Sequence, residues 1–116
     1  MKSIHFEASV HDWEVIDPQG TIQIEPMALA PRMTTLEGKT VLLRWNAKPN
    51  GDVFANRVAE LLSAGVKDVR IIKMWELDPS TAVIPGRTAA PETVSNQIAK
   101  KIANLKPDIV IGLQGD

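Results

Sequence analysis

Three short, mostly apolar stretches in the second part of the chain have the composition of buried β-strands. They are Thr40–Trp45, Val69–Trp75 and Ile109–Ile111, and each is rich in β-branched or long aliphatic side chains. A helical periodicity fills each interval between them. The order strand, helix, strand, helix, strand predicts a small parallel sheet with right-handed crossovers. We therefore expect an α/β fold of the Rossmann-like kind, a three-layer sandwich with helices on both faces of the sheet.

Each predicted helix has a start signal and an apolar face. Asp52 is placed to act as the N-cap of the first helix, whose apolar face comprises Val53, Phe54, Val58, Leu61 and Leu62. The second helix starts at Pro91, a residue that suits the first helical turn, and Pro107 stops it. Its apolar face consists of Val94, Ile98, Ile102 and Leu105.

Residues 1–38 form an opening section that we expect to be an arm or a small hairpin. Asp17–Gly20 has the composition of a β-turn. Val10–Ile16 and Thr21–Ile24 are predicted to pair as short strands around this turn.

The remaining residues, 39–116, are predicted to form the α/β domain. The last strand runs into a glycine turn, and a helix is expected after it. The domain is therefore interpreted as truncated before its next helix. Without that helix, Ile111 and Leu113 are expected to face solvent or a partner chain.

Composition narrows the function classes. A net charge of −1 offers no basic patch for phosphate-rich partners, which argues against nucleic acid. No apolar run is long enough to cross a bilayer and the N-terminus lacks the apolar core of a signal peptide, so a cytoplasmic location without membrane contact is predicted.

Cysteine is absent, so residues 1–116 contain no disulfide, no thiolate zinc site and no cysteine nucleophile. The two histidines, His5 and His11, are six residues apart, which matches neither helical nor strand alignment. We read them as exposed or partly packed side chains whose role the sequence leaves open. No metal site and no cofactor are predicted.

The loop after the first predicted strand is a candidate binding site, because ligands gather at the carboxyl ends of parallel strands. Asn46 and Asn50 offer amide groups, and Lys48 offers a cation. Gly51 permits close approach of the backbone, and the helix that opens at Asp52 offers free amides to an anion. Neither the dinucleotide fingerprint nor the phosphate-binding loop sequence is present. The alternative is a polar turn with a good helix cap.

The end of the chain is a second candidate. Gly115 allows a sharp turn, and Asp116 could hold a substrate group or cap a helix, although a solvated aspartate is the alternative. Arg44 and Trp45 are read as framework. Arg87 could bind an anion or be an ordinary exposed arginine.

Together these segments resemble the UGSC family, which comprises selenocysteine- or cysteine-containing proteins related to the B-component selenoprotein of glycine, sarcosine and betaine reductases. The resemblance covers roughly residues 15 to 116 and is carried by Val15–Gly20, Leu29–Arg32, Leu36–Val41, Asn46–Val53 and Arg57–Leu62. The Gly-Lys-Thr-Val strand and the Asn-x-Lys-Pro-Asn loop are its more specific parts.

The resemblance implies a redox function. In the family, the third strand ends in Gly-Asp and is followed by selenocysteine or cysteine, then Gly, Ser and Cys. This sequence ends at Gly115 and Asp116. Selenocysteine is encoded by UGA, so we expect a chain terminated at that codon, with no catalytic residue of its own. Asn46, Lys48 and Asn50, with Asp116, are implied to orient a small carboxylate or carbonyl substrate.

The leading interpretation is the N-terminal part of a selenol- or thiol-dependent reductase component that works with partner reductase subunits or as a homodimer. A non-catalytic α/β subunit covered by another chain is the second interpretation. A small-anion-binding module that uses the Asn46–Asp52 loop is the third.

Overall fold

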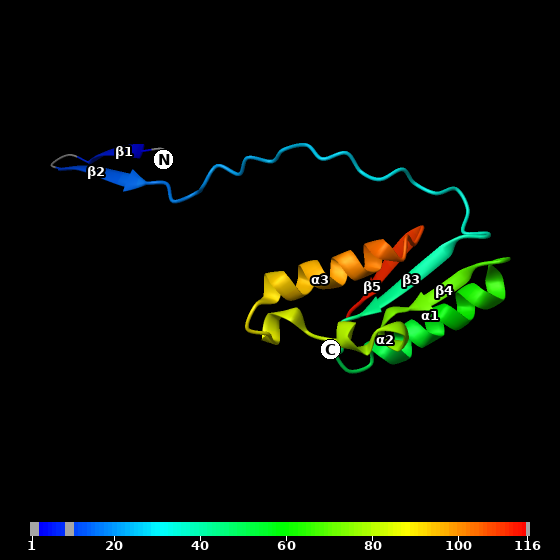
Figure 1. Ribbon diagram of the computed structural model, residues 1–116. Coiled ribbons are helices and arrows are strands. Elements are labelled where there is room, and N and C mark those ends of the chain that lie inside the picture. Colours follow the sequence, from blue (N-terminus) through cyan, green and yellow to red (C-terminus); the bar gives the residue numbers. More distant parts are fainter. Residues whose placement is uncertain (1–2, 9–10, 116) are drawn as a thin grey trace. The chain divides into compact units, whose positions relative to one another are not determined.

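The computed structural model describes residues 3–8 and 11–115. They form two compact units, Met1–Arg32 and Met33–Asp116. The second unit contains a three-stranded parallel sheet in the order β4-β3-β5 (Figure 1). Its strands are β3 (Thr40–Trp45), β4 (Arg70–Lys73) and β5 (Ile109–Leu113). A mixed α/β fold with a small parallel sheet is thus confirmed.

The helices connect these strands in chain order. Helix α1 (Gly51–Gly65) joins β3 to β4, and α3 (Pro91–Asn104) leads to β5. Between β4 and α3 lie a short helix, α2 (Met74–Leu77), and the 3₁₀ turns η1 (Pro79–Thr81) and η2 (Pro85–Arg87). The chain moves from β3 to one edge of the sheet and then back to the other edge. Figure 1 shows α1 and α3 on opposite sides of the sheet.

Side-chain alternation along β3 separates the two faces. Val41 and Leu43 are fully buried on the α1 side, where they pack with Ala55 and Ala59. Leu42 is also fully buried, and alternation directs it to the opposite face. β3 is therefore the centre of the core, covered on both sides.

Helix α1 packs on the sheet through its small residues. Gly51, Ala55 and Ala59, one turn apart, are its buried residues, while Val58 and Leu62 flank them. Of the predicted apolar face, Val53, Phe54 and Leu61 are instead more than half exposed. The prediction was wrong because small side chains let the helix approach the sheet closely, which hydrophobic periodicity alone does not reveal.

Ile111 and Leu113 of β5 were predicted to face solvent or a partner chain, but the structure places them against the core. Leu113 lies in the core, and Ile111 packs against it beneath α1. Val110, which points to the other face, is 46% exposed. The helix that covers Leu113 is α1, which contacts β5 as well as β3 and β4.

Strand β4 is shorter than predicted. It ends at Lys73, where its pairing with β3 also ends, and the chain turns into α2. Met74 is buried at the start of α2, and the Trp75 ring packs edge-on against Trp45, with ring centroids 6.2 Å apart. Met74 and Trp75 are therefore apolar because they pack in the tertiary structure, and not because β4 continues through them.

The Met1–Arg32 unit contains a hairpin, but with a different partner strand from the one predicted. β1 (Ser3–Ala8) pairs antiparallel with β2 (His11–Ile16), and only two residues separate them in the sequence. Thr21–Ile24 belongs to no strand. The side chains of His5 and His11 lie outside the described part of the structure.

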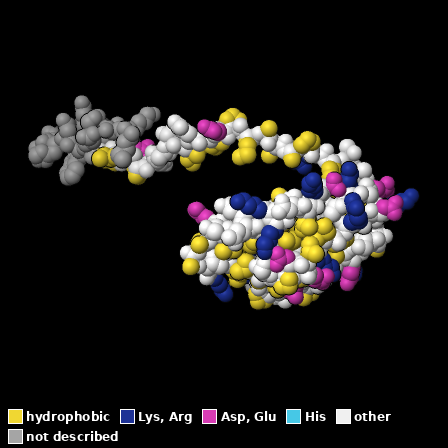
Figure 2. Space-filling view, viewed as in Figure 1, with side chains coloured by type: hydrophobic (Ala, Val, Ile, Leu, Met, Phe, Trp, Pro, Cys, Tyr) yellow, Lys and Arg dark blue, Asp and Glu magenta, His cyan; other side chains and the backbone are white. Residues whose placement is uncertain are grey.

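Residues 17–32 have no regular secondary structure and carry exposed apolar side chains. Ile22, Ile24, Met27 and Leu29 are all more than 80% exposed. Hydrophobic side chains follow this segment in Figure 2. Asp17 accepts a hydrogen bond from the Gln19 amide at 2.9 Å, which is the local structure found where a turn was predicted.

Among the described residues, no helix has the length and apolar character needed to cross a membrane.

Candidate functional site

The carboxyl ends of β3 and β5 meet through the side chain of Asn46. Its Oδ1 atom accepts hydrogen bonds from the amides of Lys48, at 3.2 Å, and Gly115, at 3.3 Å. The Asn46 amide in turn donates to the Leu113 carbonyl at 3.3 Å. Asn46 therefore joins the β3–α1 loop to the segment after β5, a structural role for its oxygen atom.

The Lys48 main chain is fixed in the same loop. Its carbonyl accepts from the indole Nε1 of Trp45, at 2.7 Å, and from the Gly51 amide, at 3.3 Å. Because the backbone is held on both sides, the half-buried Lys48 side chain leaves the loop from a defined position. Trp45 is thus a framework residue that supports the loop.

Two glycines make this close arrangement possible. A Cβ atom on Gly51 would lie 2.5 Å from Cδ1 of Trp45 and 2.9 Å from the Gly115 amide nitrogen. A Cβ on Gly115 would collide with the carbonyl oxygens of Lys48 and Pro49. The backbone after β5 therefore lies directly against the first turn of α1.

Asn50, rather than Asp52, occupies the N-cap position of α1. Asn50 has the left-handed φ of 66°, which asparagine tolerates better than most residues, and its side chain makes no capping hydrogen bond. Asp52 is the second residue of the helix, where its charge favours the positive end of the dipole. The expected cap at Asp52 is therefore corrected to a first-turn acid.

A groove of about 500 Å³ opens beside this loop, between the carboxyl end of the sheet and α3. The sheet and its loops supply polar groups from Arg44, Asn46, Lys48 and Gln114. Helix α3 and the η2 segment supply most of the apolar wall, together with one hydroxyl: Ile84, Pro85, Ser95, Ile98, Ala99 and Ile102. The lining contains two cations and no carboxylate, so the groove suits an anionic group.

Arg44 was read as framework from the sequence, but it lines this groove. It is half-buried, and its Nη2 atom donates to the Val83 carbonyl at 3.2 Å. Burial lowers the pKa of its guanidinium from the ordinary value. Among the described residues, neither Arg44 nor Lys48 is paired with a carboxylate.

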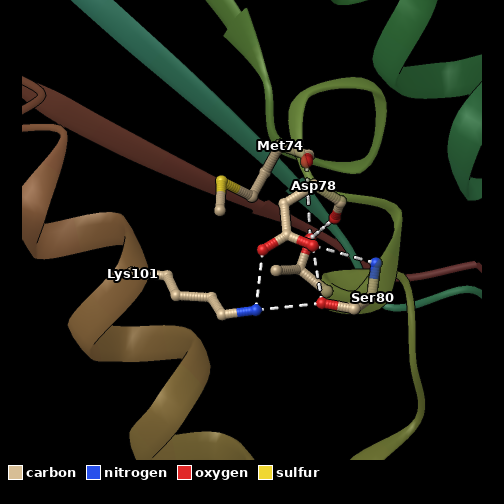
Figure 3. Close-up of polar contacts among 5 residues, drawn as sticks. Met74, Asp78, Ser80 and Lys101 are labelled. Atoms are coloured by element: carbon tan, nitrogen blue, oxygen red, sulfur yellow. Dashed lines mark hydrogen bonds and ion pairs between the residues drawn. The ribbon is translucent and has the colours of Figure 1, made fainter.

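The apolar wall is positioned by contacts between the η1 segment and α3. Lys101 of α3 donates to Asp78 Oδ2 at 2.7 Å and to Ser80 Oγ at 2.9 Å (Figure 3). Asp78 Oδ1 also accepts from the amide and hydroxyl of Ser80. Thr81, which is buried, donates to the Asp78 carbonyl at 2.7 Å. This cluster ties the segment leading to Ile84 and Pro85 to the last turn of α3.

The structure brings some predicted site residues together and separates others. Asn46 and Lys48 share the groove, whereas Asn50 is exposed and does not line it. Arg87 is exposed in η2 and is also outside the lining. Asp116 lies outside the described residues.

Arg44 and Gln114 were not among the predicted site residues. Alternation along β3 does place Arg44 on the same face as Leu42. The groove, however, exists because α3 lies over that face, and the sequence alone does not show where α3 packs.

The polar groups that line the groove are those of Arg44, Asn46, Lys48, Ser95 and Gln114. The groove offers two cations and amide groups, and the chain has no thiol. No group of three or more His, Asp or Glu side chains is arranged to hold a metal ion within residues 3–8 and 11–115. On the face visible in Figure 2, acidic and basic side chains of the Met33–Asp116 unit are intermixed rather than gathered by sign.

Comparison with known protein families finds a similarity over most of the chain. The sequence profile of the UGSC family matches residues 14–111, which is most of the chain. The matched range includes Arg44, Asn46 and Lys48, whereas Gln114 and Gly115 lie beyond it. No curated protein and no solved structure matches.

Proposed function

Because this chain belongs to the UGSC family, we propose that it is the N-terminal part of a selenol- or thiol-dependent oxidoreductase acting on a small carboxylate or carbonyl substrate. The resemblance implies selenocysteine or cysteine, followed by Gly, Ser and Cys, directly after the pair formed by Gly115 and Asp116. We propose that a UGA codon encodes the residue after Asp116 and that the protein works in the cytoplasm with partner reductase subunits. We also propose that the complete domain has a Rossmann-like three-layer arrangement.

The observation that carries the proposal is the contact between Gly115 and the first turn of α1. A Cβ on Gly115 would lie 2.7 Å from the Gly51 amide nitrogen, so the two backbones touch. A residue two positions after Gly115 has its Cα within about 7.6 Å of that of Gly115, since successive Cα atoms are about 3.8 Å apart. The implied nucleophile is therefore within reach of the amino-terminal end of α1.

This position suits a reactive chalcogen. The free amides and the dipole of a helix N-terminus stabilise a selenolate or thiolate and lower the pKa of the parent group. The Lys48 side chain leaves the same loop and adds a positive charge to the neighbourhood. A selenenylsulfide between this group and the second cysteine of the family sequence would be reduced by a thiol through exchange, which restores the selenol and the thiol while the reductant becomes the disulfide.

Within the chain, substrate orientation falls to Lys48 and to the amide NH₂ of Asn46. The Asn46 oxygen is occupied by two backbone amides, which leaves its NH₂ group as the donor that can face a ligand. The resemblance implies that Asn50 and Asp116 also orient the substrate, and we include both residues in the proposal.

The nucleotide sequence after the Asp116 codon is the first test. We expect UGA, followed by codons for Gly, Ser and Cys. A UAA or UAG codon at that point, or a UGA with no such codons beyond it, contradicts the redox proposal.

A reactivity measurement is the second test. A protein extended with the downstream sequence, with cysteine at the position after Asp116, should be alkylated by iodoacetamide at neutral pH, below the ordinary thiol pKa of about 8.5. A serine variant at the same position is the matched control. If the extended protein alkylates no faster than a free thiol peptide, the nucleophile is not activated and the proposal fails.

A second function, a subunit that pairs with another chain, is favoured by the outer side of α1. Val53, Phe54 and Leu61 are 65%, 61% and 56% exposed there, which is unusual for three large apolar side chains on one helix. Sedimentation velocity of the present chain tests it. A stable dimer or a complex with a co-purified subunit supports pairing, and a monomer at all concentrations opposes it.

A further inference from the structure

Arg44 has the properties of a ligand anchor rather than of a framework residue. Its guanidinium is half-buried and donates to the Val83 carbonyl, yet among the described residues it has no carboxylate partner. Removing a charge from water without a counter-charge is unfavourable. A bound carboxylate would offset that cost, and guanidinium binds carboxylates with two parallel hydrogen bonds.

The wall opposite Arg44 is apolar. Ile84 comes from the segment before η2, while Ile98 and Ile102 stand one turn apart on α3. Ligand sites are typically apolar clefts of about 300 to 1,000 Å³ with a few polar groups that fix orientation. The groove, at about 500 Å³, is within that range and is far larger than a two-carbon acid requires.

We propose that the groove between β3 and α3 binds a monocarboxylate that carries an aliphatic chain. Arg44 holds the carboxylate, Lys48 is the second cation, and Ile84, Ile98 and Ile102 contact the chain. As a substrate site the groove rests on the proposed function, because it names the substrate class. Binding itself can be measured on the present chain, because it contains the residues named here as lining the groove.

Titration of the present chain with straight-chain acids tests the ligand class. Acetate, butyrate, hexanoate and octanoate should bind with rising affinity, by up to about fourfold for each methylene that becomes buried. Chemical shifts of backbone amides around Gln114 and Ser95 report the site. Hexanamide, which has the same length without the charge, should bind at least tenfold more weakly than hexanoate.

Substitutions test the roles of the cations. Arg44→Met should weaken hexanoate binding by between about 10- and 150-fold, the effect of losing hydrogen bonds to a charged group. Arg44→Lys keeps the charge but not the bidentate geometry, so its loss of hexanoate affinity should be smaller than that of Arg44→Met. If Arg44→Met does not fold, the affinity of Arg44→Lys tests the role of Arg44 instead. Lys100→Met, on the exposed surface of α3 outside the groove, is the control and should bind like the wild type.

The wall has its own test. Ile84→Ser should reduce the affinity gain from butyrate to octanoate while leaving acetate binding unchanged. Equal affinities for hexanoate and hexanamide, or unchanged hexanoate binding in both Arg44 variants, would overturn the proposal.

The two proposals can fail separately. Chain-length-dependent binding without a reactive chalcogen in the extended protein would retain the groove and remove the reductase. A reactive chalcogen without carboxylate binding in the groove would do the reverse.

Discussion

Two glycines let the ends of β3 and β5 meet at the first turn of α1. Gly51 and Gly115 are in contact with each other and with the loop that carries Lys48. Neither has a positive φ, so what each position excludes is the volume of a side chain and not a backbone conformation. Steric space at single residues therefore limits what sequence this loop can accept.

Gly51→Ala should destabilise the protein. Its Cβ would lie 2.5 Å from the Trp45 ring, whose Nε1 is already bonded to the Lys48 carbonyl. Overpacking of this kind costs about 1 to 3 kcal/mol of unfolding free energy, to be measured by urea denaturation. Gly65→Ala, at the other end of the same helix, meets nothing within 4 Å and is the control. Equal stability of the two variants would show that the loop relaxes freely.

At the scale of elements, the cluster formed by Asp78, Ser80 and Lys101 connects the η1 segment to α3. The pKa of the Asp78 carboxyl lies below its ordinary value, chiefly because Lys101 and then Ser80 donate hydrogen bonds to it. A depressed folded-state pKa means that the carboxylate stabilises the folded state above its unfolded-state pKa, and that this contribution disappears as the pH falls through the folded value.

Lys101→Met should therefore lower the melting temperature at neutral pH. The decrease should be small, because both side chains are partly exposed and solvent screens the pair. The difference between variant and wild type should shrink once the pH falls below the ordinary Asp78 value of 3.8. Lys100→Met is the matched control, and thermal unfolding followed by circular dichroism measures both. A difference that stays constant down to low pH would mean that Lys101 acts through packing alone.

For the whole molecule, the division into Met1–Arg32 and Met33–Asp116 places the sheet, the loop and the groove in the second unit. Near the start of the Met33–Asp116 unit, Leu36 packs against the buried hydrophobic cluster. Gly38, with a φ of 68°, donates to the Lys67 carbonyl at 3.1 Å. The segment just before β3 is thus part of this unit's packing.

A protein consisting of residues 33–116 should fold and unfold cooperatively by itself. A second one, starting at residue 39 as the sequence-based boundary suggests, should be about 1 to 3 kcal/mol less stable, since it loses the Leu36 packing and the Gly38 hydrogen bond. Equilibrium denaturation of the two proteins compares them. Similar stabilities would place the boundary at residue 39.

What the sequence determined by itself is the order and class of the elements of the α/β unit. Strand composition located β3 at Thr40–Trp45, and proline located the start of α3 at Pro91, because these signals act through backbone geometry within a few residues. The family resemblance came from the same local stretches and was confirmed.

Only the tertiary structure decided which faces meet. It buried Ala55 and Ala59 of α1 in place of Phe54, paired β2 with β1, and set α3 across from Arg44 to form the groove. Each outcome depends on how closely two distant segments can approach, and that is set by side-chain volume and strand pairing across the fold. Periodicity along a single segment holds no information about its partner, so the groove between β3 and α3, with Arg44 in its lining, became visible only in three dimensions.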